Sequence, residues 1–230
     1  MTTLCNPYLF YYNDVIIPTK TPAILKWLFS GFLWDIKNGS SHNKIFLTFD
    51  DGPIPGVTEF VLDLLEEYNA KATFFCIGDN IRKHPTIFDR ILDEGHAIGN
   101  HTMNHLKAWK TNNKDYIQNV IECQNAIDKR IKDKNAPLLF RPPYGQISFG
   151  KTRILKRMGY TIVLWDVLSK DWKQEIKPQK CLQNVLSKAQ SGSVIVFHDS
   201  IKSSEKLQFA LPEVLKYYTE KGFSFEKIAS

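Results

Sequence analysis

After residue 40, short runs of apolar, β-prone residues alternate with longer amphipathic stretches. Such apolar runs are typical of buried strands, and the stretches between them have the periodicity of helices with one apolar face. The pattern predicts strands at 45–49, 72–77, 97–100, 138–141, 161–165, 193–198 and 223–227. It predicts helices at 57–68, 85–94, 114–132, 149–158, 178–190 and 211–221.

Glycine stands just before four of these strands, as Gly95, Gly159, Gly192 and Gly222. A loop from a helix to a strand uses glycine to end the helix. Seven alternating units therefore predict an α/β fold of parallel strands covered by helices, either an open sheet or a closed barrel. In both arrangements catalytic groups lie at the carboxyl ends of the strands.

The 230 residues, 43% of them hydrophobic, are enough for one core. We predict a catalytic domain at 41–230, preceded by an extension at 1–40. Residues 23–34, AILKWLFSGFLW, are apolar but too few to span a bilayer. They are interpreted as a helix packed on the barrel, with a segment lying at a membrane surface as the alternative.

The N-terminus has no basic region followed by an uninterrupted apolar stretch. This predicts a cytoplasmic location, with membrane association or export by an unrecognised route as alternatives. The net charge of +6 is spread along the chain without basic clusters, which argues against nucleic-acid binding. The four cysteines lie far apart and form no CxxC pair, which argues against a zinc ribbon or a disulfide framework. The oligomeric state has no sequence signal.

Polar side chains capable of catalysis follow five of the predicted strands. Because these strand ends meet at one rim, the side chains are expected to converge there. They are Asp50, Asp51, His101, His105, Arg141, Asp166, Asp171, His198 and Asp199.

His101 and His105 in NHTMNH are four residues apart, so on a helical turn both imidazoles would face one cation. The same spacing also occurs in ordinary exposed helices. A carboxylate from a neighbouring strand end would complete a set of two histidines and one acid. Such a set leaves metal positions open for water and substrate, as in catalytic sites.

Asp50 and Asp51 in KIFLTFDDGP are adjacent, so their side chains point in different directions along an extended segment. One could bind a metal while the other accepts a proton. The alternative is that both only open a turn before Gly52 and Pro53.

Five motifs, TFDDGP, HTMNH, RPPYG, WDVLSKDW and VIVFHD, occur in that order. Together they resemble the motifs of the polysaccharide deacetylases, the NodB-like domain of the fourth family of carbohydrate esterases, over about residues 44–228. The resemblance implies a distorted (β/α) barrel of about seven units. It also implies removal of N-acetyl groups from GlcNAc-type sugars of peptidoglycan or chito-oligosaccharide. The alternatives are an O-acetyl esterase acting on a xylan-like polymer and a silent carbohydrate-binding relative.

By this resemblance, Asp51, His101 and His105 hold one divalent metal ion, usually zinc and in some members cobalt, nickel or manganese. Asp50 resembles the general base, and Arg141 would hold it in place and keep it ionised.

The resemblance also assigns the remaining steps. The backbone N–H of Tyr144 would stabilise the oxyanion, and His198 would be the general acid, oriented by Asp171. Trp165 and Trp172 are candidates to line the groove for the sugar and the acetyl methyl, although tryptophans at strand ends often only pack.

Two positions depart from the family pattern. Leu168 stands where the fourth motif commonly has its first Asp. Val196 replaces a leucine of the acetyl pocket, and we expect this to shift preference rather than abolish activity. Asp166 and Asp199 are expected to be structural or to support the site indirectly. The polar residues expected not to be ligands are Asn80, His42, His84 and His96.

Overall fold

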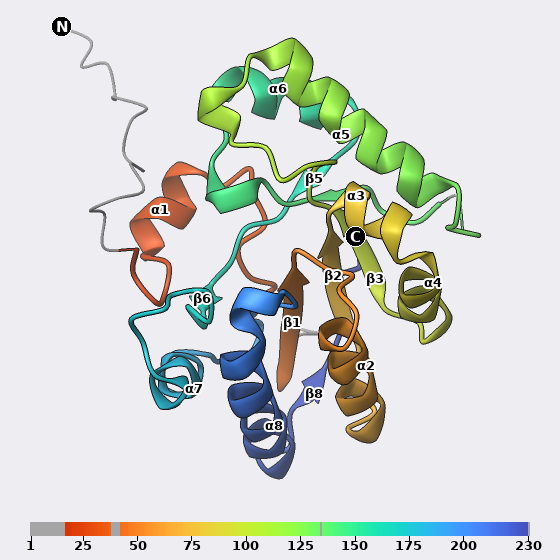
Figure 1. The fold of residues 1–230 in the computed structure, drawn as a ribbon. Helices are drawn as coiled ribbons and strands as arrows, with labels where there is room; N and C mark the ends of the chain where they lie inside the picture. Colours follow the sequence, from red (N-terminus) through yellow and green to blue (C-terminus); the bar gives the residue numbers. More distant parts are fainter. Residues whose placement is uncertain (1–16, 38–41, 134, 230) are drawn as a thin grey trace, which may run out of the picture.

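A curved parallel sheet forms the centre of the computed structural model, which describes residues 17–37, 42–133 and 135–229 (Figure 1). Seven strands follow one another in the order β5-β4-β3-β2-β1-β7-β6, and β8 pairs with β1. All these pairings are parallel. The strands are β1 (Lys44–Asp50), β2 (Ala72–Cys76), β3 (Ala97–Asn100), β4 (Leu139–Phe140), β5 (Thr161–Ile162), β6 (Val167–Leu168), β7 (Val194–His198) and β8 (Ser224–Phe225).

Helices cover the outside of this sheet, and α5 lies beside α6 as α7 lies beside α8 (Figure 1). Each long helix buries an apolar stripe, such as Val61, Leu62 and Leu65 on α2, because that stripe faces the strands. The helices are α1 (Ala23–Leu28), α2 (Val57–Glu67), α3 (Gly78–Lys83), α4 (Pro85–Asp93), α5 (Asn113–Asp128), α6 (Phe149–Arg157), α7 (Pro178–Leu186) and α8 (Ser204–Glu220). Three short 3-10 helices are η2 (Ala108–Lys110), η3 (Pro143–Gly145) and η4 (Ile201–Ser203).

The central strands are buried on both faces, which explains their nearly continuous apolar sequences. In the register, Asp50 at the end of β1 lies beside His198 at the end of β7, and Thr48 lies beside Val196. Neighbouring strands are about 4.8 Å apart, so the sheet itself brings the first and fifth motifs together.

The predicted strand at 161–165 is wrong in its second half. The strand ends at Ile162, and a separate strand, β6, begins at Val167 and pairs with β7. The carbonyls of Val163 and Leu164 accept hydrogen bonds from the Arg141 side chain at 3.3 and 3.0 Å. The Val163 N–H still donates to Phe140 of β4 at 2.9 Å, but beyond it the backbone leaves β4, and its carbonyls bind the Arg141 side chain.

Two helices also differ from the pattern. The short helix α3 was not predicted, and α8 begins at Ser204, seven residues before the predicted start. Pro212 lies inside α8, where proline usually ends or kinks a helix. The helix runs through it because Leu207, Ala210 and Leu211 pack in the main core.

Residues 19–36 lie across the two open ends of the seven-strand path. The backbone N–H of Leu33 donates to Ile162 at 2.9 Å, beside β5, and that of Ile36 donates to Gly192 at 2.8 Å, before β7. The Leu168 N–H in β6 donates to Thr19 at 2.8 Å. The segment thus forms a seam that links both edges of the incomplete barrel.

Helix α1, within this segment, buries none of its side chains. Ile24 and Trp27 are 58% and 72% exposed, and the flanking residues make the main-chain contacts with the barrel. Among the described residues, no helix has the length and apolar character needed to cross a bilayer.

Asp166, fully buried between β5 and β6, anchors the seam through charge. Its carboxylate pairs with Lys26 of α1, accepts a 2.6 Å hydrogen bond from Ser193, and lies 3.1 Å from Lys20 Nζ. Burial favours its neutral form, but the bonds from Lys26, Ser193 and Lys20 outweigh this and hold the pKa of Asp166 below its usual range.

Lys26→Met should lower the free energy of unfolding by about 1–3 kcal/mol, because it removes one partner of a buried carboxylate. The matched control Lys37→Met removes an exposed lysine that pairs with Asp35 at 3.3 Å, and should change stability by less than about 0.5 kcal/mol. A lowered pKa means that the ionic contribution is present above the unfolded pKa of about 4 and is lost as pH falls below it. The difference between Lys26→Met and the parent in denaturant unfolding should therefore shrink in acid. Equal losses from both variants at neutral pH would contradict the anchoring role.

Candidate functional site

Asp51, His101 and His105 meet at the carboxyl ends of β1 and β3. Asp51 Oδ1 lies 3.3 Å from His105 Nε2 and 3.8 Å from His101 Nε2. One ligand atom from each residue lies within 4.8 Å of the others. The predicted metal ligands are therefore brought together.

The donor atoms of this cluster are in the chemical state that a metal requires. His101 Nδ1 lies 2.7 Å from the carbonyl of Arg141, to which it donates its proton, so Nε2 keeps its lone pair toward Asp51. Burial, with His105 acting in the same direction, lowers the pKa of His101 to about 3, and burial also lowers that of His105. Within the described residues, Asp51 Oδ1 is a buried oxygen without a hydrogen-bond partner. A divalent cation fits two neutral imidazoles and such an oxygen.

The spacing of the two histidines predicted a shared helical turn, and this prediction is wrong. Residues 101–107 form a non-helical loop, in which Thr102 and His105 have φ angles of 66° and 55°. These left-handed conformations bring the second imidazole back toward the first, with ring centroids 5.1 Å apart. The two imidazoles therefore lie close together, as predicted, but a loop and not a helical turn brings them there.

Asp51 is itself in a left-handed conformation, with φ of 88°. A residue with a side chain rarely adopts such an angle, at a cost of about 1–3 kcal/mol, unless its surroundings hold it there. Asn80 Nδ2 donates to the Asp51 carbonyl at 2.7 Å, and Asp199 Oδ1 accepts from the Gly52 N–H at 2.9 Å. Thr58 Oγ1 donates to Asp199 Oδ2 at 2.6 Å. These contacts clamp the turn that aims the Asp51 carboxylate.

Gly52 is required by this clamp. A Cβ atom at this position would lie 1.9 Å from Asp199 Oδ2, a distance that no side chain can accommodate. Burial raises the pKa of Asp199 to about 8, against the hydrogen bonds from Thr58 and Gly52. Asp199 thus accepts hydrogen bonds from a backbone N–H and a hydroxyl group, and it adds no ligand atom to the cluster.

Asp50 is held by Arg141. Arg141 Nη1 donates to Asp50 Oδ1 at 2.7 Å and to Thr48 Oγ1 at the same distance. The guanidinium is completely buried and lies 4.0 Å from the centre of the Phe75 ring. The contact predicted between Asp50 and Arg141 is present, and it fixes the position of one carboxylate oxygen.

On the β7 side, His198 is held by Asp171. His198 Nδ1 donates to Asp171 Oδ1 at 2.8 Å, and the backbone N–H of His198 donates to Oδ2 at 2.7 Å. Burial disfavours the imidazolium, but Asp171, with further help from Asp51 and Asp50, outweighs it and raises the pKa of His198 to about 9. The edge of the Trp172 ring contacts this imidazole, with centroids 4.9 Å apart.

Tyr144 in η3 closes the metal side of the site. Its hydroxyl lies 3.1 Å from His105 Nδ1, and its φ of 60° is again left-handed. The half-buried Trp165 packs on Gly145, where an added Cβ would lie 2.6 Å from the ring. Val196 is only 1% exposed and lies two residues before His198 on β7. Trp172 thus lies against His198 and Trp165 beside the Tyr144 turn, whereas Val196 is buried within β7.

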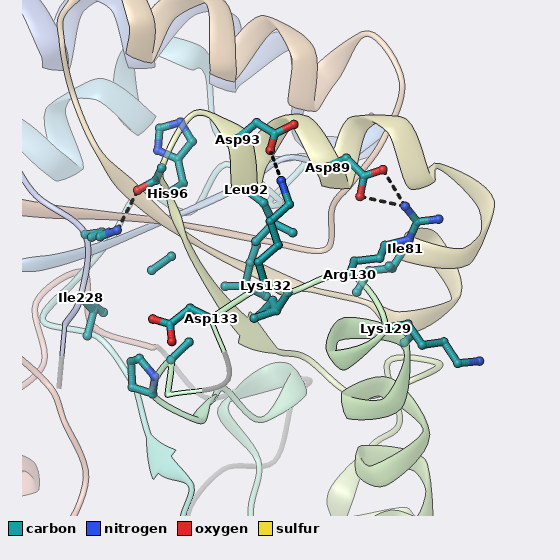
Figure 2. Close-up of a pocket in the computed structure, with 18 of the residues that line it drawn as sticks. Ile81, Asp89, Leu92, Asp93, His96, Lys129, Arg130, Lys132, Asp133 and Ile228 are labelled. Carbon is teal, nitrogen blue, oxygen red and sulfur yellow. Dashed lines mark hydrogen bonds and ion pairs between the residues drawn. The ribbon is translucent and has the colours of Figure 1, made fainter.

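A cavity of about 1010 Å³ lies elsewhere, by the amino end of β3 (Figure 2). Two ion pairs lie on its wall, since Arg130 binds Asp89 at 2.6 and 2.8 Å and Lys132 lies 3.5 Å from Asp93. None of the predicted site residues lines it. Size alone therefore does not identify the functional site.

Comparison with known proteins agrees with this geometry. The family model described as polysaccharide deacetylase matches residues 37–163. The chain belongs to the polysaccharide deacetylase family. This confirms the resemblance carried by the five motifs, and it supports a hydrolase that acts on amide bonds of polysaccharides.

Individual family members cover most of the chain. A peptidoglycan-N-acetylglucosamine deacetylase of Bacillus cereus is 34% identical over 202 residues, 85% of this chain and 90% of the relative. The peptidoglycan-N-acetylmuramic acid deacetylase PdaC of Bacillus subtilis is 33% identical over 185 residues, 80% of this chain but only 38% of that longer protein.

A solved family structure confirms the predicted barrel. It is a peptidoglycan N-acetylglucosamine deacetylase in complex with 4-naphthalen-1-yl-N-oxidanyl-benzamide. The TM-score is 0.81 at 31% identity, over 90% of this chain and 95% of that one.

Asn80→Ala should weaken metal binding about tenfold, because loss of a group that supports a ligand typically costs 10- to 100-fold in affinity. The measurement is competition between the protein and a chelator for Zn²⁺ or Co²⁺. Asn125→Ala, at an exposed position on α5, is the matched control and should leave affinity unchanged. An unchanged affinity in Asn80→Ala would show that the Asp51 turn does not need the clamp.

Proposed function

We propose that the chain is a divalent-metal-dependent hydrolase that removes the acetyl group from N-acetylated amino sugars of a glycan. The observation that carries this proposal is the juxtaposition of three parts at one rim. These parts are the Asp51–His101–His105 cluster, the Arg141-bound Asp50 and the Asp171-bound His198.

Zinc suits the cluster best, because two imidazole nitrogens and one carboxylate oxygen leave a coordination position open for catalysis. Cobalt, nickel and manganese accept the same donor types. When bound, the ion supplies Lewis-acid polarisation of the acetyl carbonyl and lowers the pKa of water.

Asp50 is the general base. Arg141 occupies Oδ1, so we assign Oδ2 to the attacking water, from which it takes a proton as the water oxygen bonds to the acetyl carbon. The buried guanidinium holds the Asp50 carboxylate in place for this first step.

The oxyanion and the leaving group need separate partners. The backbone N–H of Tyr144 is assigned to the oxyanion, a contribution of about 3 kcal/mol for such a donor. The amide C–N bond breaks as His198 gives its Nε2 proton to the departing nitrogen, and acetate and a free amine result. Asp171 binds Nδ1, which leaves Nε2 as the nitrogen that can donate.

Peptidoglycan and chito-oligosaccharide are the proposed substrates, with N-acetylglucosamine as the sugar. The names of the relatives from Bacillus cereus and Bacillus subtilis support a peptidoglycan-type glycan. Trp165 and Trp172 are proposed to contact the sugar and the acetyl methyl, whereas Val196, only 1% exposed, is proposed to shape the acetyl pocket from within β7.

Acetate release from a panel of glycans tests the proposal. The metal-loaded enzyme should release acetate from peptidoglycan strands or chito-oligosaccharides, and a chelator should stop the release. Acetate from acetylated xylan alone would identify an O-acetyl esterase instead. No release from any of them, with metal bound, would identify a silent relative.

Asp50→Asn should retain the metal but lower kcat about 10²- to 10⁴-fold, the usual contribution of a general base. His101→Ala should lose both metal and activity. Metal content by elemental analysis and acetate release are measured on the same samples, with the exposed Asp63→Asn as control. Parent-like turnover by metal-loaded Asp50→Asn would remove that residue from the mechanism.

The alkaline limb of the pH profile should report His198, which must be protonated to donate. Its raised pKa keeps the imidazolium up to about pH 9, and a bound cation near Asp51 would move the limb lower. Asp171→Asn removes the carboxylate that raises this pKa, so the limb should shift to lower pH. A limb that stays in place in an active Asp171→Asn enzyme would assign it to another group.

A further inference from the structure

The loops at the catalytic rim carry an uneven charge. In the segments that follow β3, β6 and β7, at 101–112, 169–177 and 199–203, the charged residues that are not buried are six lysines and one glutamate. None of these lysines forms an ion pair with a described residue. The residues are Lys107, Lys110, Lys170, Lys173, Lys177 and Lys202, with Glu175.

Lys107 places one of these charges beside the metal cluster. Its Nζ lies 5.0 Å from the centre of the Tyr144 ring, and that ring lies 4.6 Å from the His105 ring. The residue is exposed, and the cation–π contact fixes an otherwise flexible ammonium over the rim. The charge is therefore held one aromatic ring away from a metal ligand.

Lys170 begins a second cationic group on the His198 side. It precedes Asp171, has a φ of 64° and is half-buried. Burial lowers its pKa, and the charges of Lys173 and Lys180 act in the same direction. Like charges gathered beside a site repel one another, and an anion placed among them relieves the repulsion.

We propose that this rim selects an N-acetylated glycan that carries carboxylates, with Lys107 as a specificity-determining residue. The inference rests on the proposed function. Because Lys107 lies one aromatic ring away from His105, a glycan whose acetamido group sits at the Asp51–His101–His105 cluster would bring a carboxylate on a nearby substituent within reach of this charge. A neutral chito-oligosaccharide has no such group, so it gains nothing from the rim lysines.

The test compares three substrates of matched length by kcat/KM. The first is a strand of alternating N-acetylglucosamine and N-acetylmuramic acid with free carboxylates. The second is the same strand with its carboxylates converted to methyl amides, and the third is a chito-oligosaccharide. The parent should prefer the first over the second about tenfold at low salt, and the preference should shrink at 0.5 M salt because ions screen exposed charges.

Lys107→Gln should lower kcat/KM on the carboxylate strand about fivefold, mainly through KM, and leave the amidated strand within about twofold of the parent. Lys107→Arg, which keeps the positive charge, should retain the parent's preference for the carboxylate strand over the amidated strand. Lys216→Gln removes an exposed lysine from α8, away from the rim loops, and serves as the matched control. A merely structural role of Lys107 would instead lower activity on both strands equally.

Two negative results are distinguishable. If the parent deacetylates both strands at equal rates, or if Lys107→Gln loses activity on both equally, the selection of carboxylates is overturned while the deacetylase function stands. If the metal-loaded parent releases no acetate from any of the three substrates, the proposed function fails, and the selection fails with it.

Discussion

The buried guanidinium of Arg141 is the contact on which the rest of the site depends. A buried charge is tolerated only when it is paired and hydrogen-bonded, and all three guanidinium nitrogens of Arg141 donate hydrogen bonds, to Asp50, Thr48 and the carbonyls of residues 163 and 164. Its own carbonyl accepts a hydrogen bond from His101 Nδ1–H and so sets the tautomer of a proposed metal ligand. One residue directly after β4 therefore orients the proposed general base, Asp50, from one side and His101 of the proposed metal cluster from the other.

The sequence predicted the parts of this site that lie at strand ends. Apolar runs located the strands, and the register then required Asp50 and His198 to meet. Asp199 was expected to be structural or to support the site indirectly, but the clamp that it forms with Asn80 and Thr58 was not predicted. The clamp acts on backbone groups whose left-handed conformation leaves little trace in a pattern of apolar and polar residues. Gly52 in DDGP was the available signal, since a glycine beside two acids can mark a close approach as well as a turn.

Errors in the predicted elements also arise from contacts of backbone groups, which the pattern of apolar and polar residues does not record. The run at 161–165 looks like one strand, yet Arg141 takes two of its carbonyls, and the chain resumes in the sheet only at Val167. The apolar segment at 23–34 suggested a helix, and the helix is short. Besides the Lys26–Asp166 pair, this part of the chain is joined to the barrel by main-chain pairing of residues that flank the helix, including Leu33 and Ile36. Side-chain periodicity does not predict such pairing.

The seam formed by residues 19–36 has a practical consequence for anyone who trims the chain. The family match begins at residue 37, so a fragment cut to that boundary would keep every catalytic side chain but lose the seam. The backbone groups of Ile162, Leu164, Leu168 and Gly192 would then lose their hydrogen-bond partners at the two edges of the incomplete barrel. Such borders recruit strands from other molecules, so the shortened protein would tend to associate with itself even though its chemistry is complete.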